Sequence, residues 1–232
     1  MSSRLRITSI ALLVASAVGC TPNAAPENSM KRSKVEYDLL KQIHDAEDST
    51  TRATLITKLE ATSVDRVPFY DRWIRLHKPW ALECWTDDGY DSSLSDLHPD
   101  IQLLPSMCYG KFDIYNGGLH QLFVNGTGVM APEMQQWCER AGLQATADVL
   151  GEAIAVFGSE FPRSQSVRQT YLMEYSKRAQ ASDAPESWNP FSEMDNRFYS
   201  SCDGFDTAAD KWLREVCGIT SLHTPPGGIT KP

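Results

Sequence analysis

The sequence lacks any apolar run of the roughly 20 residues that a transmembrane helix needs, and its longest such stretch covers residues 7–18. It also lacks extended alternation of apolar and polar residues, because no alternating run of β-branched residues exceeds about four positions. The absence of a long apolar run argues against a protein built from membrane-spanning helices. The absence of alternation argues against an extensive β-sheet, so we expect the core to be built from helices.

Signatures of metal and nucleophilic chemistry are also missing. Five histidines and six cysteines form no H-x-x-x-H or C-x-x-C pair, so the common zinc-binding patterns are absent. No G-x-S-x-G sequence marks a nucleophile elbow, and the glycines at 126 and 128 lack the lysine of a phosphate-binding loop. We therefore expect no cofactor, no metal site and no catalysis.

Positive charge is scarce. The chain has 30 acidic residues and 22 basic ones, and two of the basic residues, Arg4 and Arg6, lie in a segment that we expect to be removed. The remaining 30 acids and 20 bases give a net charge of −10. Such a balance disfavours direct nucleic-acid binding, which needs cations against phosphate. It suits a protein partner with a basic surface, or simple solubility.

The N-terminus resembles a bacterial export signal. A short basic region precedes the apolar stretch 7–18, which is too short to span a bilayer but fits the middle of a secretory signal. The stretch runs into Ala17-Val18-Gly19-Cys20, which resembles the lipobox of bacterial lipoproteins, where small residues precede the cysteine that takes the lipid. We predict a lipoprotein signal peptide over residues 1–19 and a lipid anchor on Cys20.

The same segment sets the expected location. Thr21 stands where the usual sorting pattern has an aspartate for retention at the inner membrane. The resemblance therefore implies a lipid-anchored protein of the cell envelope, at the outer membrane and facing the periplasm. Two alternatives stay open: Ala15-Ser16-Ala17 also fits an ordinary A-x-A cleavage site, which would give plain secretion, and the segment would otherwise remain as an uncleaved anchor.

Polar, proline-containing segments flank the body of the chain. Residues 20–34 are predicted to form a flexible tether and residues 219–232 a disordered tail, because neither has enough apolar surface to bury. Between them, most segments carry apolar residues at helical spacing. We expect an all-α fold, a single compact multi-helix domain, with N-terminal helices and an acidic loop over 35–110 and a helical domain over 110–218.

The segment from Pro79 to Gly110 differs from its surroundings. It contains no Lys or Arg, and its glycine and prolines interrupt helical spacing. We predict a long acidic loop, because loops of this length in compact domains are often functional. Its acidic start at 87–91 lacks the distal Glu of a calcium loop. Its acids are the predicted partner-binding residues: Glu83, Asp87, Asp88, Asp91, Asp96 and Asp100.

Cysteines in an oxidising envelope are able to pair. A Cys84–Cys108 disulfide would brace the acidic loop, and a Cys202–Cys217 disulfide would hold the last helix to the turn before it. Cys138 would then remain as a buried thiol. The alternative is that most of these cysteines are buried and reduced, since sequence alone does not fix connectivity.

Residues 116–125 have an unusual composition for a helix. Asn116-Gly117-Gly118 opens an apolar stripe, and Gln121 and Asn125 follow. Two adjacent glycines cost about 1 kcal/mol each relative to alanine inside a helix, so we expect another backbone to approach them closely. The polar side chains would then satisfy backbone groups at that approach. A ligand or partner site is the alternative.

This motif resembles the C-terminal domain of the DNA-mimic protein family, a domain of unknown function. The family pattern has an N-G-G-F-x-Q-F/Y-F-x-N helix and a helix ending in a glycine-containing turn. A helix ending in L-F-P, a P-x-x-x-x-R segment and an L-D-x-x-F-Y helix follow. Five blocks of this chain keep that order and spacing between about residues 110 and 216: 116–125, 132–142, 149–157, 162–168 and 194–199.

The resemblance implies an all-helical fold. Arg168 and Asp195 lie in two of the matching blocks, and we hypothesise that they form an ion pair. The best-known member is acidic and dimeric, and it occupies the DNA-binding face of a transcription factor. The resemblance therefore implies a protein partner, and it makes a homodimer a candidate assembly.

Three functions remain open from the sequence. The leading prediction is a lipid-anchored envelope protein with an acidic, helical protein-binding module, because an exported protein does not meet transcription factors. The second is a cytoplasmic DNA mimic that blocks a DNA-binding protein. The third is an envelope enzyme or small-ligand binder that uses His120, Asn116 and Asn125.

Overall fold

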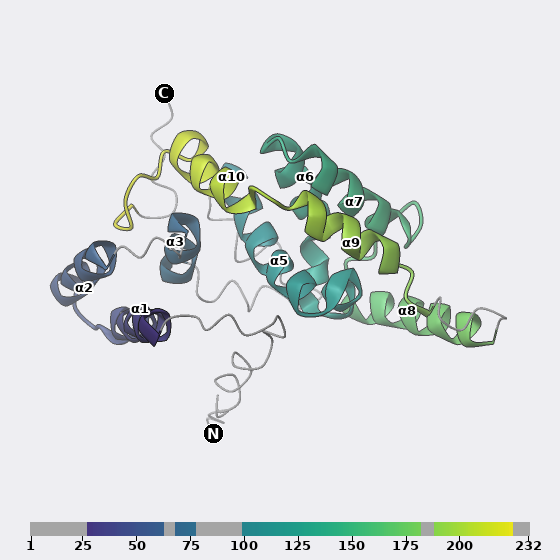
Figure 1. The fold of residues 1–232 in the computed structure, drawn as a ribbon, viewed down its shortest axis with the longest axis horizontal. Coiled ribbons are helices and arrows are strands. Elements are labelled where there is room, and N and C mark those ends of the chain that lie inside the picture. The colour runs from purple at the N-terminus through teal and green to yellow at the C-terminus, as the bar shows by residue number, and fades with distance from the viewer. Residues whose placement is uncertain (1–26, 63–67, 78–98, 182–187, 225–232) are drawn as a thin grey trace, which may run out of the picture.

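The structure is a computed structural model that describes residues 27–62, 68–77, 99–181 and 188–224, with side chains described from residue 34 onward. Every element in these ranges is helical (Figure 1). The α-helices are α1 (Glu27–Asp45), α2 (Ser49–Ala61), α3 (Phe69–His77), α5 (Pro99–Val124), α6 (Ala131–Arg140), α7 (Gln144–Ala155), α8 (Gln165–Gln180), α9 (Ser192–Ser201) and α10 (Phe205–Lys211). A 3₁₀ helix (Gly126–Met130) precedes α6, and a π-helical turn (Trp212–Val216) extends α10. The predicted all-α fold is confirmed.

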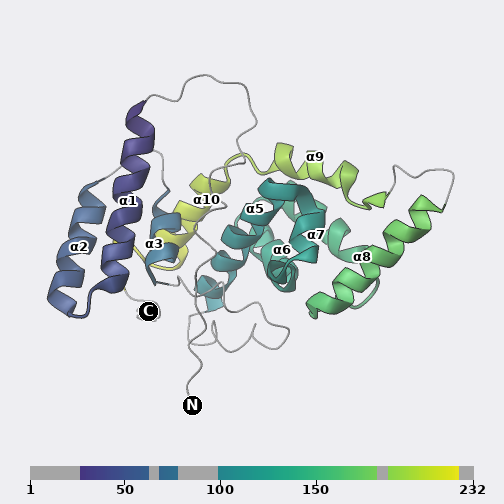
Figure 2. The ribbon, with the colours of Figure 1, turned by 90° about the horizontal axis from the view of Figure 1, so that it is seen from below.

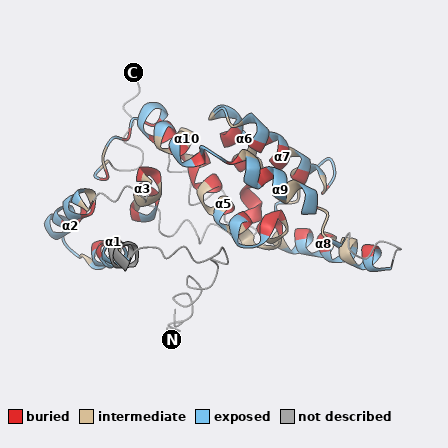
Figure 3. Ribbon diagram, viewed as in Figure 1, coloured by how far each residue is buried: buried red, intermediate tan, exposed pale blue. Residues whose placement is uncertain are grey.

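Helix α5 forms the centre of the larger part of the molecule. Helices α6, α8 and α9 pack against α5, and α7 packs between α6 and α9 (Figure 1). Buried residues gather where these helices meet (Figure 3). The ring of Phe123 on α5 lies 5.0 Å from the rings of both Phe157 and Phe191. Aromatic side chains contribute large buried areas, so they stabilise this core.

The predicted loop up to Gly110 is wrong for residues 99–110, which form the first turns of α5. Pro99 occupies the start of the helix, where its missing N–H costs nothing. Pro105 lies inside α5 and is buried among apolar residues that include Leu104 and Met107. The free energy gained by burying this face offsets the loss of the hydrogen bond that a proline removes from a helix. The loop was predicted because prolines are usually found outside helix interiors.

Helices α1, α2 and α3 form a smaller unit beside this core, which we call the N-terminal unit. Helix α1 packs along α2 and also touches α3 (Figure 2). Ile43, Leu59 and Trp73 are almost fully buried between them. Asp48 caps α2 by accepting a hydrogen bond from the Thr51 N–H at 2.7 Å, which satisfies one of the free donors at a helix N-terminus.

Polar contacts from α10 hold the N-terminal unit to the larger part. The Asp210 carboxylate accepts hydrogen bonds from the backbone N–H groups of Phe69 (3.3 Å) and Tyr70 (2.8 Å), so a residue of α10 caps α3. The Tyr70 hydroxyl donates to Asp206 at 2.8 Å. The Arg214 guanidinium lies 4.0 Å from the centre of the Phe69 ring. At this junction, carboxylates of α10 therefore accept hydrogen bonds from the start of α3.

Residues 217–224, which we call the C-terminal strap, also join the two parts. Leu222 is fully buried, and its N–H donates to Glu60 Oε1 at 2.7 Å. The Trp73 indole N–H donates to the Thr224 carbonyl at 3.1 Å, and His77 Nε2 lies 2.7 Å from the Leu222 carbonyl. The prediction of a disordered tail over 219–232 is therefore wrong for residues 219–224, and residues 225–232 lie outside the described residues.

The predicted tether is also shorter than expected. It was expected to extend to residue 34, but α1 begins at Glu27. Signal peptide 1–19 and Cys20 lie outside the described residues. Of the helices in the described ranges, none combines the length and apolar character needed to cross a membrane.

Candidate protein-binding surface

The Asn-Gly-Gly motif marks a break inside α5. Gly117 and Gly118 leave the helical conformation, and Gly118 has φ +74°. Only glycine adopts that region without a steric penalty. The chain therefore stops one helical segment at Asn116 and starts a second one at Leu119, which ends at Val124.

Asp195 on α9 caps the start of this second segment. Its Oδ1 accepts the Leu119 N–H at 2.7 Å, and a Cβ built on Gly118 would lie 2.6 Å from its Oδ2. The expected close approach to the glycines is confirmed, but the approaching group is a carboxylate instead of a backbone. Burial raises the pKa of Asp195, although the hydrogen bond from Leu119 acts in the opposite direction. A carboxylate at a helix N-terminus also interacts favourably with the helix dipole.

Arg168 on α8 caps the other end of the segment. Its fully buried guanidinium donates to the carbonyls of Phe123 (3.0 Å) and Asn125 (3.0 Å), beyond which it reaches the Pro162 carbonyl at 3.1 Å. The hypothesised Arg168–Asp195 ion pair is wrong, because each residue serves the opposite end of the same short helix. The helix dipole favours a positive charge at the C-terminal end of a helix and a negative charge at the N-terminal end.

The cap at the C-terminal end extends beyond Arg168. The side-chain amides of Gln165 and Gln169 both donate to the Val124 carbonyl, at 2.9 and 2.8 Å. Gly128 makes room for the guanidinium, since a Cβ there would lie 3.0 Å from Arg168 Nε and 2.7 Å from the Leu122 carbonyl. The free carbonyls at the end of α5 are therefore satisfied inside the protein.

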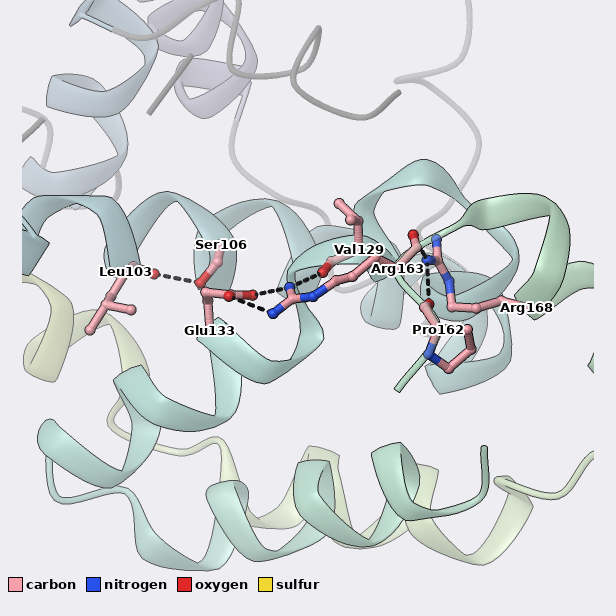
Figure 4. A network of polar contacts seen from close by, with 7 residues as sticks. All are labelled: Leu103, Ser106, Val129, Glu133, Pro162, Arg163 and Arg168. Carbon is pink, nitrogen blue, oxygen red and sulfur yellow. Dashed lines mark hydrogen bonds and ion pairs between the residues drawn. The ribbon is translucent and has the colours of Figure 1, made fainter. Parts of the chain in front are cut away.

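A neighbouring network anchors the loop before α8 (Figure 4). Arg163 forms a two-point ion pair with Glu133 on α6, with N–O distances of 2.7 and 2.9 Å. The same guanidinium donates to the Val129 carbonyl of the 3₁₀ helix. Figure 4 shows Arg163 between these two acceptors and Arg168 directed at Pro162. Two-point contacts of this kind fix orientation, so the loop that carries Arg168 is held in place.

Asp113 receives the other polar side chains of the motif. Its carboxylate accepts from the Asn125 amide at 3.1 Å and from the Thr127 hydroxyl, and Gln121 also donates to it. Burial raises the pKa of Asp113, and these hydrogen bonds act to lower it. The prediction that the side chains of Gln121 and Asn125 satisfy backbone groups is wrong, because both bind Asp113, which was not predicted as a site residue. Asp113 could have been noticed in the sequence, because no other acidic residue occurs between 101 and 132.

The three residues proposed for a small-ligand site have different surroundings. Asn116 is exposed, and Asn125 binds Asp113. The His120 ring packs edge-on against Trp188 at 5.3 Å, and burial lowers the pKa of this histidine. A shallow hollow lies elsewhere, between α1 and α2, lined by residues that include Leu39.

The acidic residues predicted to bind a partner are mostly outside the described ranges: Glu83, Asp87, Asp88, Asp91 and Asp96. Asp100 is described, and it forms an ion pair with Arg140. Its backbone carbonyl accepts the Trp212 indole N–H at 2.9 Å. Asp100 therefore supports the packing of α5 against α6 and the end of α10.

Cys202 and Cys217 are free in the structure, so the predicted disulfide between them is not formed. The α10 helix and its π-helical turn separate them, and twelve helical residues span about 18 Å, far beyond disulfide reach. Burial raises the pKa of Cys202 to about 11 and that of Cys217 to about 12. Cys108 and Cys138 are also free thiols, and Cys84 lies outside the described residues.

The break in α5 carries exposed aromatic side chains. Tyr115 directly precedes Asn116 and is 54% exposed. Its ring lies 5.4 Å from that of Tyr199 on α9, in an edge-to-face arrangement. The Tyr199 hydroxyl donates to the Ile114 carbonyl at 2.8 Å. The motif thus provides a rigid support, and the side chains beside it face outward.

Comparison with known proteins assigns the larger part of the molecule to a family. Residues 95–216, just over half of the chain, match the family described as DMP19-like protein. The match begins before Pro99 and so includes the first turns of α5, which the sequence pattern had assigned to a loop. No curated protein and no solved structure matches the chain. On the extent of the family match, this chain belongs to the DMP19-like protein family.

Proposed function

We propose that this chain is a lipid-anchored protein of the cell envelope whose DMP19-like domain binds a protein partner with a basic surface. It acts by binding and performs no catalysis. The observation that carries the proposal is the distribution of charge. Residues 95–216 contain 17 Asp and Glu against 9 Lys and Arg, a formal charge of −8. Such a domain repels nucleic acid and attracts a cationic protein surface.

Contacts within the domain occupy many of its few bases. Lys111, Arg140 and Arg197 form ion pairs with carboxylates of the same domain, as Arg163 does with Glu133. Arg168 is fully buried at the end of α5. These bases are engaged internally, so the excess of carboxylates remains available to a partner. Electrostatic complementarity of this kind mainly sets specificity and association rate.

The anchoring part of the proposal rests on the N-terminal sequence, and metabolic labelling tests it. Cells that express the full-length chain should incorporate an alkyne fatty acid into it, and the Cys20→Ala variant should not. The wild-type chain should fractionate with the outer membrane. An unlabelled chain with an intact Met1 in the cytosol would contradict anchoring. It would favour the second candidate, a cytoplasmic mimic of DNA, which the family assignment supports.

Partner binding has a separate test. We expect replacement of Asp87, Asp88, Asp91 and Asp96 by Asn to weaken capture of the native partner by the tagged full-length chain. The matched control combines Asp38→Lys with Glu47→Lys, two exposed positions of the N-terminal unit, and changes the net charge by the same four units. Equal losses in both variants would show a general effect of charge. No loss in either would contradict a role for the acidic segment.

A further inference from the structure

Three aromatic side chains form an exposed group at the break in α5, and we call them the aromatic patch. Phe112 and Tyr115 lie three residues apart on α5, so they share a face of the helix. Tyr199 from α9 stands beside Tyr115. Phe112 is 57% exposed, Tyr115 54% and Tyr199 37%. Grouped exposed aromatics of this kind are typical of interaction sites.

The patch is held in a fixed arrangement. Tyr199 is fixed by its hydrogen bond to the Ile114 carbonyl, and the Asp195 cap joins α9 to the segment that follows the break. A surface organised before binding loses little conformational entropy when a partner docks. Tyrosines are well suited to this role because they combine a large contact area with few rotatable bonds.

Negative charge and a cation already meet beside the patch. Lys111 Nζ lies 5.6 Å from the Tyr115 ring centre and 4.1 Å from that of Phe205, and it pairs with Asp206 at 2.9 Å. Asp203 is exposed on the turn before α10. Burial raises the pKa of Tyr115, and the nearby charges of Asp203 and Asp206 raise it further. Aromatic faces beside carboxylates are therefore a feature of this surface.

We propose that the aromatic patch, with Asp203 and Asp206 at its edge, is the docking surface for arginine side chains of a basic protein partner. The proposal rests on the proposed function and names the part of the domain that performs it. An arginine guanidinium stacks on tyrosine and phenylalanine rings while it also binds a carboxylate. A lysine ammonium is more strongly hydrated and stacks less well, so the surface should distinguish the two bases.

Fluorescence anisotropy with the full-length chain tests this inference. The probes are labelled peptides of nine arginines and of nine lysines, in about 150 mM salt to reduce long-range attraction. We expect the wild-type chain to bind the arginine peptide several-fold more tightly. Phe112→Ala with Tyr115→Ala should weaken arginine binding about fivefold or more and remove most of the preference.

A matched control removes two apolar side chains from another surface. Val167→Ala with Met173→Ala truncates residues of α8 that are about as exposed as the patch, at 52% and 51%. This variant should keep the arginine preference, and thermal unfolding should show that both variants are folded. Retention of the preference in the patch variant, or its absence from the wild-type chain, would overturn the docking surface alone. Failure of the wild-type chain to bind either peptide would overturn the proposed function as well.

Discussion

The N-terminal unit and the DMP19-like domain differ in charge and in how their helices are held. Residues 27–77 contain nine acids and nine bases and are formally neutral, whereas residues 95–216 carry −8. The domain satisfies both ends of the short helix that follows the break in α5 from within, through Asp195 and Arg168. The N-terminal unit caps α2 itself through Asp48, but it takes the cap of α3 from α10 and a further hydrogen bond to Glu60 from the C-terminal strap. The domain thus carries the net charge and caps this helix with its own residues, whereas the N-terminal unit is formally neutral and takes part of its support from the domain.

Loss of the buried arginine should produce the largest effect. Arg168→Met keeps an apolar stem of similar length but removes the guanidinium donor from the carbonyls of Phe123, Asn125 and Pro162, of which Asn125 keeps the Gly128 N–H. Buried carbonyls that lose a charged donor cost about 1–3 kcal/mol each, so we expect the free energy of unfolding to fall by at least about 3 kcal/mol. Urea unfolding followed by circular dichroism measures this change.

The control for that variant is Arg178→Met, at an exposed position near the end of the same helix. A surface substitution of this kind should change stability by no more than about 0.5 kcal/mol. If the two variants were equally stable, the cap at the end of α5 would not be what supports the domain, and the contrast with the N-terminal unit would fail.

Substitution of the two glycines at positions 118 and 142 should have unequal effects on stability. Both have positive φ, but a Cβ at Gly142 meets nothing within 4 Å, whereas at Gly118 it meets Asp195. Gly142→Ala should cost about 1 kcal/mol from backbone strain, and Gly118→Ala about 1–3 kcal/mol more, because its ψ of −176° adds strain and its Cβ meets Asp195. Thermal or urea unfolding gives both values.

Coupling with Asp195 provides the matching control. In a double-mutant cycle, Gly118→Ala should destabilise an Asp195→Ala background much less than the wild-type chain, because the crowded carboxylate is gone. Additive effects would mean that the approach of Asp195 to Gly118 has no energetic consequence.

The smallest effect concerns pH and the N-terminal unit. Burial lowers the pKa of His77, so the folded state binds its proton less readily than the unfolded state. The stability that neutral His77 provides is therefore present above pH 6.5 and declines as pH falls below 6.5. We expect α3 and the C-terminal strap to exchange amide hydrogens faster at pH 5.5 than at 7.5, after correction for intrinsic rates.

His77→Gln should remove that difference, because glutamine keeps a donor for the Leu222 carbonyl and does not titrate. Amides of α6 and α7, which have no contact with this histidine, serve as the internal reference. An equal response to acid in both regions would show that the two parts of the molecule open together.

Helical spacing and the family resemblance predicted much of the larger domain from sequence. The all-α fold was predicted correctly, and the matching blocks 132–142 and 149–157 lie on α6 and α7 or directly after them. The first turns of α5 were missed because Pro99 and Pro105 suppress a helical pattern that burial restores. The order of residues 219–224 was missed because their contacts come from Glu60 and Trp73, more than 140 positions away.

The roles of the motif residues were harder to predict. Gly117 and Gly118 predicted a close approach, since glycine composition reports on backbone geometry directly, but the break in α5 was not predicted. The partners of Arg168 and Asp195 were wrong because opposite charges suggested an ion pair, whereas each side chain binds backbone groups at a helix end. Nearly every residue type has the same backbone groups, so a single sequence does not show which residue a side chain contacts through its backbone.

The C-terminal strap has a consequence for the order in which the polypeptide is completed. Synthesis releases the N-terminal residues first, yet α2 and α3 receive contacts from Asp210, Leu222 and Thr224, near the other terminus. Closing such long loops is slow compared with forming local helical contacts. The first helices to emerge are therefore among the last to find their final positions, and a chain released before its closing residues would leave them without those partners.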